Sequence, residues 1–296
     1  MSNIFRKKGF TQPHFYPHKS GAGFTLIEFL VVIATLGLLA SVVVVSTKSS
    51  KDRARIASLL SYSATIKKVL GADIVGEWRF GEGSGPSVAD SSGNNNNGTW
   101  NGTDYWAQKQ GTIYELGEAG KFSGDDYVYI PNSNSLRFLD QITIEAWIKT
   151  NRVDSGWMVV SNPGTYYFYF LGFFNSRPRF FIGPYGDLGG DLAFSCPSDP
   201  FVVGQWHHYV GTYNGSKMKI IVDSKEICSR DYSVTGMFYT YPLTLGALLD
   251  TNTNTSYYMF DGNIDEVKIY NRSLITAEIQ QHYVEGAKKR GLLAGE

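Results

Sequence analysis

The chain has 296 residues, with 27 basic and 27 acidic side chains and a high content of Gly, Tyr and Phe. This length allows one large domain in addition to a membrane helix, and the balanced charge argues against nucleic acid as a partner. Abundant aromatic residues and glycines favour β structure with many turns.

The N-terminal segment combines a basic stretch with a long apolar run. Residues 1–22 contain no acid and four basic residues, Arg6, Lys7, Lys8 and Lys19. The run over 24–45 would measure about 33 Å as a helix, enough to cross a hydrocarbon core, and the preceding charges predict a cytoplasmic N-terminus. Its only ionisable residue is Glu28. A carboxylate at membrane depth costs roughly 2.5–3.5 kcal/mol on insertion scales, so Glu28 is a functional candidate.

The residues Gly23-Phe24-Thr25-Leu26-Ile27-Glu28, followed by an apolar run, resemble the type IV prepilin class, which includes pilins and secretion-system pseudopilins. The resemblance implies a leader over 1–23, cleavage after Gly23 by a prepilin peptidase, and N-methylation of Phe24. It also implies that Glu28 pairs with the terminal amine of a neighbouring pilin-like subunit. An ordinary signal anchor is the alternative. A cleaved secretory signal fits less well, because its apolar region is usually only about 7–15 residues long.

The helix is expected to continue past the membrane. Residues 46–55 are polar but contain neither Pro nor Gly, and apolar residues then recur at roughly helical spacing at Ile56, Leu59, Leu60, Ile66 and Leu70. We therefore predict a transmembrane and stalk helix over 24–70, about 70 Å long. Its second half either packs on the head or forms a solvated stalk. Removing the leader would leave 23 basic and 27 acidic residues, so the mature chain is acidic.

From Ala72 onward, short β-branched and aromatic runs alternate with clusters of Gly, Asn, Asp and Ser. Strands are expected at 74–80, 127–130, 142–149, 158–160, 166–174, 179–182, 206–213, 217–222, 226–229, 243–248 and 263–270. Asn214-Gly215-Ser216 is expected to form a hairpin turn, and a short helix follows with Thr276 as N-cap and Glu278 in its first turn. We predict a mainly β, antiparallel two-sheet jelly-roll sandwich over 71–285, and a flexible tail over 286–296.

The strand over 142–149 shows the clearest alternation. Apolar residues at even positions face one side, and Thr143, Glu145, Trp147 and Lys149 face the other. Cys196 and Cys228 both lie in the part that would be exported, so we expect one disulfide, with two buried thiols as the alternative.

Four stretches of the head carry a second resemblance: Asp90-Ser91-Ser92-Gly93 with Gly98, then 125–131, 206–215 and 262–274. In this order they resemble the laminin-G-like jelly roll of the concanavalin A-like lectin and glucanase class, over about 76–283. The resemblance implies a carbohydrate- or protein-recognition module, often with bound calcium.

Catalysis by the head is not expected. The glucanases of this fold class carry a Glu-x-Asp-x-x-Glu run or one close to it, and the chain has none. Glu145 is alone on its strand. Asp265 and Glu266 are adjacent, as are His207 and His208, so each pair is expected to point to opposite faces and cannot act together.

Two features suggest ligand contacts. Asp265 would share the apolar face of Val267 and Ile269, where a charge needs a partner or a cation. Calcium bound jointly by Asp90 and Asp265 would supply one; the alternative is that backbone amides satisfy Asp265 and that Asp90 caps a turn. The strand over 166–174 carries aromatic rings on both faces. One face must fill the core, and the other either stacks on sugar rings or packs beneath a loop or subunit contact.

These observations predict a type IV pilin-like protein with an extracytoplasmic lectin-type head. It would be anchored in the inner membrane or built into a surface filament, and the head would bind a glycan or a surface protein in adhesion. The alternative is a structural minor pseudopilin of a type II secretion or DNA-uptake system, with no glycan ligand. A membrane-tethered glycan hydrolase is a third class, which the missing paired acids disfavour.

Overall fold

The computed structural model describes residues 26–27, 29–35, 73–102, 119–137, 140–153, 156–162, 167–175, 177–184, 194–197, 200–234, 241–250 and 253–293. The chain divides into two units, Met1–Thr65 and Ile66–Glu296. In the first unit the structure describes a short helical stretch. The second unit contains the head.

In the first unit, residues 26–27 and 29–35 are helical. Within the described ranges, no helix is both long enough and apolar enough to span a membrane. Gly23, Phe24, Glu28 and most of the expected helix over 24–70 lie outside those ranges. Cleavage, methylation, subunit pairing and membrane anchoring therefore stay predictions.

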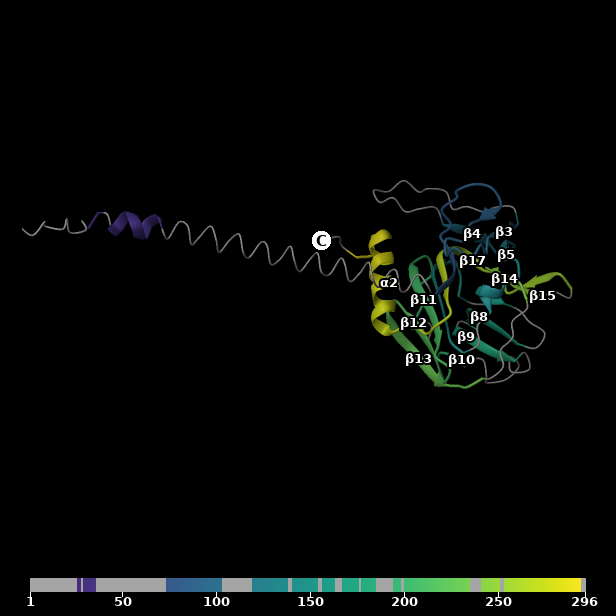
Figure 1. Cartoon of the computed structure of the whole chain (residues 1–296). Helices are drawn as coiled ribbons and strands as arrows, with labels where there is room; N and C mark the ends of the chain where they lie inside the picture. Colours follow the sequence, from purple (N-terminus) through teal and green to yellow (C-terminus); the bar gives the residue numbers. More distant parts are fainter. Residues whose placement is uncertain are drawn as a thin grey trace, which may run out of the picture. The chain divides into compact units, whose positions relative to one another are not determined.

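The head is a sandwich of two antiparallel sheets (Figure 1). Sheet A has the order β1 (Ile74–Trp78), β17 (Asp261–Tyr270), β6 (Ile142–Thr150), β11 (Trp206–Tyr213), β12 (Lys217–Val222) and β13 (Lys225–Asp231), with β4 (Gly120–Ser123) also pairing with β17. Sheet B has the order β10 (Phe194–Ser195), β9 (Arg177–Pro184), β8 (Tyr167–Phe174), β7 (Trp157–Asn162), β14 (Leu243–Leu245), β5 (Tyr127–Ile130), β3 (Gly98–Asn101) and β2 (Ser87–Val88).

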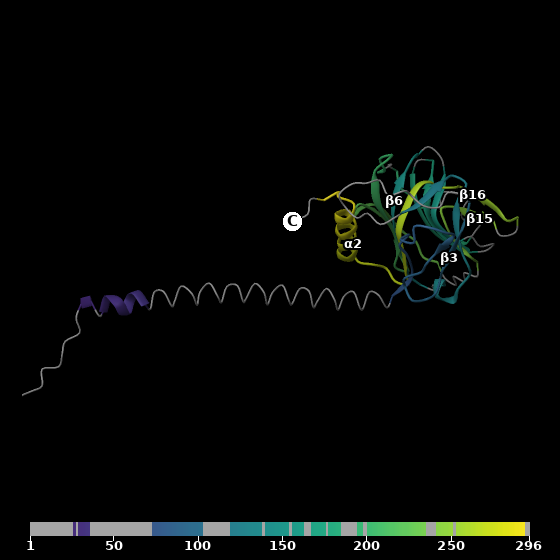
Figure 2. The same cartoon turned by 90° about the horizontal axis from the view of Figure 1, so that it is seen from above.

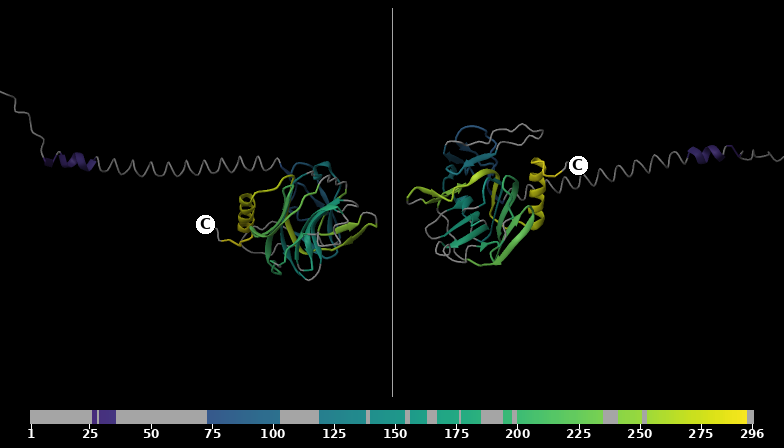
Figure 3. Two further views of the ribbon diagram at one scale, coloured as in Figure 1. Left: turned by 90° about the horizontal axis from the view of Figure 1, so that it is seen from below. Right: turned by 180° about the vertical axis from the view of Figure 1, so that it is seen from behind.

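Three smaller elements complete the head: the hairpin of β15 (Leu248–Asp250) and β16 (Thr255–Tyr257), the 3-10 helix η1 (Asn134–Leu136), and α2 (Thr276–Lys289). Helix α2 lies along the outside of sheet A, and the β15–β16 hairpin projects on the opposite side of the head (Figures 1 and 2). The views from below and behind show the same arrangement (Figure 3). The two outer surfaces of the sandwich are therefore covered differently.

The predicted alternation of β6 is confirmed. Its even-numbered residues, Ile142 to Ile148, lie in the core between the sheets. The sheets approach so closely that a Cβ on Gly211 of β11 would lie 2.3 Å from the ring of Phe180 on β9. The opposite face of β6 is also buried, with Glu145 and Trp147 only 1% and 2% exposed, because α2 covers it.

The predicted hairpin turn is also confirmed. β11 and β12 have the expected bounds. Gly215 has φ 93°, and the Asn214 side-chain oxygen accepts hydrogen bonds from the Ser216 and Lys217 amides at 3.0 and 2.8 Å. The short strands β2, β3, β4, β10 and β16 were not expected, because each offers too few residues for a periodic pattern.

The predicted disulfide is confirmed. Cys196 and Cys228 are bonded, with their Cα atoms 5.7 Å apart. Cys196 directly follows β10 in sheet B, whereas Cys228 lies on β13 in sheet A. The bond therefore joins the two sheets at the ends of their strand orders.

A β-bulge overturns the expectation that Asp265 shares a face with Val267 and Ile269. The register of β17 against β6 shifts between Asp265 and Lys268, and Glu266 has φ 46°. Ile264, Val267 and Ile269 face the core. The extra residue turns Asp265 and Glu266 outward beneath α2.

Helix α2 begins at Thr276, with Ile275 as the N-cap, so the expected N-cap is one residue too late. Glu278 does lie in the first turn and accepts a hydrogen bond from the Ile275 amide at 2.9 Å. The helix runs past the expected domain end at residue 285. The helix continues to Lys289, and Arg290 is only 8% exposed. Gly286 permits this packing, because a Cβ there would lie 2.2 Å from Trp147 Nε1.

Candidate functional site

Two regions of the head concentrate polar and aromatic side chains. The first is a buried cluster around Glu145, between sheet A and α2. The second is a partly exposed group of rings and arginines on the outer face of sheet B. The two regions differ in their access to solvent, and therefore in what they can bind.

Glu145 is the centre of the buried cluster. Its Oε1 accepts a hydrogen bond from the Tyr270 hydroxyl at 3.1 Å and lies 3.3 Å from Lys268 Nζ. Its Oε2 lies 3.0 Å from His282 Nδ1 and 3.5 Å from His208 Nε2. Glu145 is alone only along its own strand, since its partners come from β11, β17 and α2.

The charges in this cluster are matched. Burial by itself would raise the pKa of Glu145, but Lys268, His282 and His208 outweigh burial and hold it well below its ordinary value. Burial would lower the pKa of Lys268, but Glu145 and the nearby Glu266 and Glu77 raise it. Both shifts favour the charged pair.

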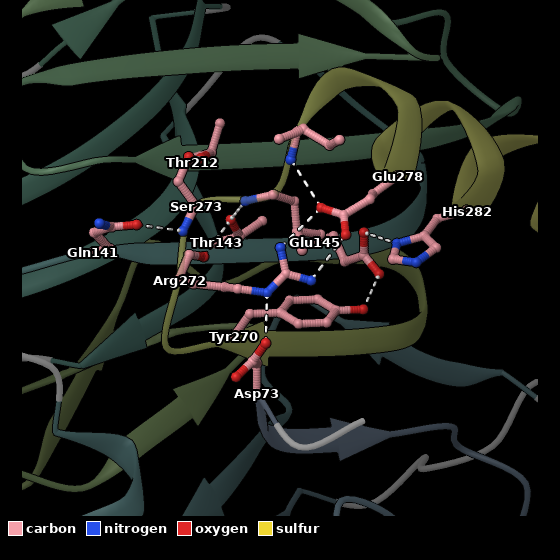
Figure 4. Close-up of polar contacts among 12 residues, drawn as sticks. Asp73, Gln141, Thr143, Glu145, Thr212, Tyr270, Arg272, Ser273, Glu278 and His282 are labelled. Carbon is pink, nitrogen blue, oxygen red and sulfur yellow. Dashed lines mark hydrogen bonds and ion pairs between the residues drawn. The ribbon is translucent and has the colours of Figure 1, made fainter. Parts of the chain in front are cut away.

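Arg272 fixes the start of α2 beside this cluster (Figure 4). Its guanidinium donates to Asp73 Oδ2 at 2.7 Å and to both Glu278 oxygens at 2.8 and 3.0 Å. Thr143 Oγ1 donates to the Arg272 carbonyl and accepts from the Leu274 amide, both at 2.9 Å. The first turn of α2 is thus tied to β6, to the end of β17 and to the residue before β1.

The other end of α2 is held by Arg290. Its guanidinium lies 4.4 Å from the ring centre of Trp147 and 4.9 Å from that of Trp206. It pairs with Asp265 and lies 3.9 Å from a Glu266 oxygen. Asp265 and Glu266 therefore both contact Arg290. This corrects the expectation that two adjacent residues cannot act together, because the bulge turns both side chains toward α2.

His207 and His208 do point to opposite sides, as expected. His208 faces Glu145, whereas His207 accepts a hydrogen bond from the Val202 amide at Nε2, 3.0 Å away. Its Nδ1 therefore donates to Asp223 Oδ2, at 2.7 Å. This histidine fixes a loop and a turn.

The Glu145 cluster is closed to a substrate. Glu145 is 1% exposed and His208 is 2% exposed, and α2 covers both. A Glu–His arrangement can transfer protons in principle, but here the His282 contact joins sheet A to α2, and the other three contacts join β6 to its neighbouring strands β11 and β17. We infer that the cluster holds α2 in place on sheet A.

The structure gives Asp90 partners of its own. Asp90 Oδ1 accepts from the Glu77 and Ser92 amides at 2.9 and 2.8 Å. Asp90 Oδ2 accepts from Ser92 Oγ at 2.8 Å and from the Asn96 amide at 2.9 Å. Asp90 thus caps the turn at the start of its loop and holds the loop to β1.

Asp265 is also partnered within the protein. Its Oδ1 accepts from the Glu266 amide at 2.7 Å, and its other oxygen meets Arg290. Burial raises the pKa of Asp265 to about 7, against the charge of Arg290. Asp90 and Asp265 thus both have hydrogen-bond donors within the protein, as the alternative to a shared calcium ion expects. Among the described residues, no three His, Cys, Asp or Glu side chains gather as a metal group; calcium binding itself stays a prediction.

The aromatic strand β8 places rings on both faces, as predicted. Tyr169 and Phe173 fill the core. Phe170, on the other face, stacks on Phe181 with ring centres 5.6 Å apart and is 2% exposed. It packs with Met158 and with Leu248 of the β15–β16 hairpin, so Phe170 lies beneath a hairpin and offers no surface to a sugar.

One end of this face remains open. The aromatic–basic corner, as we call it, consists of Phe174, Arg177, Arg179 and Tyr258. The Phe174 and Tyr258 ring centres are 5.7 Å apart at an interplanar angle of 65°, and the Arg179 guanidinium lies 4.5 Å from the Phe174 ring centre. Tyr257 and Tyr258 are 47% and 41% exposed.

Backbone contacts hold the corner together. The Met158 amide donates to the Tyr258 carbonyl at 2.9 Å. A Cβ on Gly156 would lie 2.9 Å from the Tyr258 ring and 3.0 Å from the Phe174 ring. The aromatic pattern of the strand over 166–174 pointed to Phe174 but not to Tyr258. The signal for Tyr258 that the sequence offered was a pair of adjacent tyrosines after a stretch rich in Thr and Asn.

Comparison with known proteins agrees with this architecture. The profile of the concanavalin A-like lectin/glucanases superfamily, of laminin G type, matches residues 122–280. No curated protein sequence matched the chain.

Solved structures share the fold at low identity. Domain 4 of AbnA, a GH43 extracellular arabinanase from Geobacillus stearothermophilus in complex with arabinotriose, is 18% identical with a TM-score of 0.53, over 71% of this chain and 97% of that one. The binding domain of Paraclostridial Mosquitocidal Protein 1 is 15% identical with a TM-score of 0.56, over 73% of this chain and 53% of that one.

The binding domain of botulinum neurotoxin DC in complex with SialylT is 13% identical with a TM-score of 0.55, over 73% of this chain and 52% of that one. This chain therefore spans about half the length of the toxin binding domains it resembles. At these identities the likeness shows the fold alone. Because the superfamily profile covers more than half of its residues, the chain belongs to the concanavalin A-like lectin/glucanases superfamily, in its laminin G-like branch.

Proposed function

We propose that the head binds glycans through the aromatic–basic corner and that the N-terminal segment anchors it as a type IV pilin-like protein. The glycan-binding part of this proposal rests on one observation: the partly exposed rings of Phe174 and Tyr258 pack together, and Arg179 lies beside them. Sugar rings bind to aromatic faces, and a few polar groups beside them orient the ligand. The corner supplies both.

Relatives of the same fold support this proposal. The arabinanase domain was solved with arabinotriose, and a neurotoxin domain was solved with SialylT. Cell entry of botulinum neurotoxin type C, another protein of this fold, depends on interaction with two ganglioside molecules. These ligands belong to those proteins. They support a glycan as the class of ligand for this head.

The anchoring proposal rests on Gly23-Phe24-Thr25-Leu26-Ile27-Glu28 and the basic residues before it. A prepilin peptidase and other pilin-like subunits are the implied partners. The head would lie outside the cytoplasm, on the inner membrane or on a surface filament. The confirmed disulfide fits that location, because disulfides persist in oxidising compartments.

We further propose that the head binds without cutting. Glu145, a carboxylate with histidine neighbours, is enclosed under α2. A reducing-sugar release assay tests this directly. The rival proposal, a structural pseudopilin with no glycan ligand, is separated from ours by the binding experiment below.

Tyr258→Ala is expected to weaken glycan binding by at least about fivefold, because an aromatic anchor at a binding site contributes more than about 1 kcal/mol. The full-length protein in detergent is first screened on a glycan array, and the affinity for the best glycan is then measured. Tyr127→Ala is the matched control, since Tyr127 is a half-buried tyrosine on β5, in a different part of sheet B. An array with no bound glycan would favour the structural pseudopilin. Equal effects of the two variants would move the site away from the corner.

Processing is tested separately. N-terminal sequencing is expected to find Phe24 first, and Gly23→Leu is expected to block cleavage by filling the space that the peptidase leaves for glycine. Gly21→Leu, two residues upstream, is the control and is expected to be cleaved. A protein that still begins at Met1 when the peptidase is present would contradict the prepilin assignment.

A further inference from the structure

Two arginines at the aromatic–basic corner have no acidic partner among the residues that the structure describes. Arg177 and Arg179 are two residues apart on β9, so their side chains leave the same face of sheet B. Phe180 and Ile182, which follow Arg179 at positions of the opposite parity, fill the core, so the face of Arg177 and Arg179 is the outer one. No carboxylate of the described residues lies within ion-pair distance of either guanidinium. Most other arginines of the head have such a partner, including Arg79, Arg272 and Arg290.

The two positive charges lie close together. Burial and the neighbouring charge of Arg177 lower the pKa of Arg179. The Arg179 Nε atom is buried without a hydrogen-bond partner, while its guanidinium lies over the Phe174 ring. An arginine stacked in this way is held rigidly before any ligand arrives. Repulsion between two neighbouring guanidiniums is relieved when an anion binds between or beside them.

Rings and arginines occur here on one surface. The ring centres of Tyr258 and Phe174 are 5.7 Å apart, and the Arg179 guanidinium lies over the same Phe174 ring. A neutral sugar would use the rings and leave both charges unmatched. A sugar with a carboxylate would stack on the rings and accept hydrogen bonds from the planar guanidinium, a geometry that suits a carboxylate because two oxygens can bind two N–H groups.

We propose that the corner selects glycans that carry a carboxylate, that is, sialic or uronic acid residues, over their neutral counterparts. This inference rests on the proposed glycan-binding function of the same site. The carboxylate could belong to a free oligosaccharide or to the head of a glycolipid, and the chemistry recognised is the same in both.

The test compares matched ligand pairs on the full-length protein in detergent. Each pair contrasts a charged with a neutral glycan: sialyllactose against lactose, and a uronic-acid oligosaccharide against its methyl ester. For at least one pair we expect about tenfold tighter binding of the acid, the size of one good charge-assisted contact, and a preference that shrinks as salt is raised. Sialyllactose in solution and the same glycan on a lipid in vesicles distinguish the two sources of the carboxylate.

Variants assign the preference to named residues. Arg179→Gln is expected to lower the preference for the acid over the neutral glycan from about tenfold to between about onefold and threefold. Arg179→Lys is expected to restore only part of this preference, because lysine keeps the charge and loses the planar fork. Arg177→Gln is expected to lower the ratio less, since it is Arg179 whose guanidinium is held over the Phe174 ring. Arg137→Gln, an exposed arginine after η1, is the control and is expected to keep the ratio.

The outcomes are distinguishable. Equal binding of acid and neutral members would overturn this inference and leave the glycan-binding proposal standing. A ratio that survives Arg179→Gln and Arg177→Gln would also overturn it, as would a stronger preference for sulfated than for carboxylated glycans. Failure to bind any member of the pairs or of the array would overturn the glycan-binding proposal itself.

Discussion

Glu145→Ala is expected to lower the free energy of unfolding of the head by about 3–5 kcal/mol, the usual cost of removing one member of a buried ion pair. The substitution leaves Lys268, which is 19% exposed at its side chain, facing a cavity without its partner. It also removes the acceptor of the Tyr270 hydroxyl and the neighbour of His282. Denaturant unfolding of the full-length protein, followed by tryptophan fluorescence, measures the loss.

Glu226→Ala is the matched control for this change. Glu226 also pairs with a lysine, Lys219, at 2.7 Å, but its side chain is 43% exposed. An exposed pair of this kind is worth less than about 1 kcal/mol. If both variants lost the same small amount, Glu145 would not hold α2 in place. The double variant Glu145→Leu with Lys268→Met is expected to recover much of the loss, because a buried pair replaced by apolar groups of similar size is often neutral.

The same residue predicts an acid limb in the stability profile. The folded pKa of Glu145 is lower than its unfolded value, so its contribution is present above about pH 4.3 and is lost as pH falls through the lower folded value. Glu145→Gln cannot titrate and is expected to show a shallower fall in stability over this acidic range. An unchanged slope would show that other carboxylates dominate acid unfolding.

Removing the disulfide is the second large effect expected. The bond closes a loop with a sequence separation of 32, which corresponds to about 3.5–4 kcal/mol in the chain-entropy model. The double variant Cys196→Ala with Cys228→Ala is therefore expected to unfold at markedly lower denaturant concentration. Because Cys196 is buried in the core, part of the loss comes from the removed sulfur atom.

Reduced wild-type protein separates these two contributions. It keeps both sulfur atoms and lacks only the covalent bond, so it is expected to lie between the oxidised protein and the double variant. Mass spectrometry of the non-reduced protein checks the starting state and should find no alkylatable thiol. A reduced protein as stable as the oxidised one would show that the two sheets hold β10 and β13 together without the bond.

The sequence by itself determined the elements whose signals are local. The β6 alternation, the Asn214-Gly215 turn and the bounds of β11 and β12 follow from side-chain period and turn chemistry, and the structure has them. The motifs along the head were enough to predict the laminin G-like sandwich. The pairing of Cys196 with Cys228 also followed, because a chain with two cysteines allows only one bond within itself.

The location of the candidate site depended on contacts that no local pattern contains. Tyr258 lies beside Phe174 because its carbonyl, directly after β16, accepts a hydrogen bond from the Met158 amide of β7. Phe170 is buried by a hairpin that follows it by more than seventy residues in the chain. Strand period predicts which residues share a face but not which element covers that face. Arg177 and Arg179 could be read as strand residues, whereas their lack of an acidic partner among the described residues is visible only in three dimensions.

The sequence thus determined the fold class, the disulfide and the likeness of the N-terminal segment to prepilins, because each rests on neighbouring residues or on a count. Only the tertiary structure decided that Asp265 meets Arg290, that Glu145 lies closed beneath α2, and that the open aromatic surface is at Phe174 and Tyr258. Two physical reasons account for the three cases. A single inserted residue in β17 reverses the facing of Asp265, and the helix and hairpin that cover the two outer faces come from segments distant in the chain.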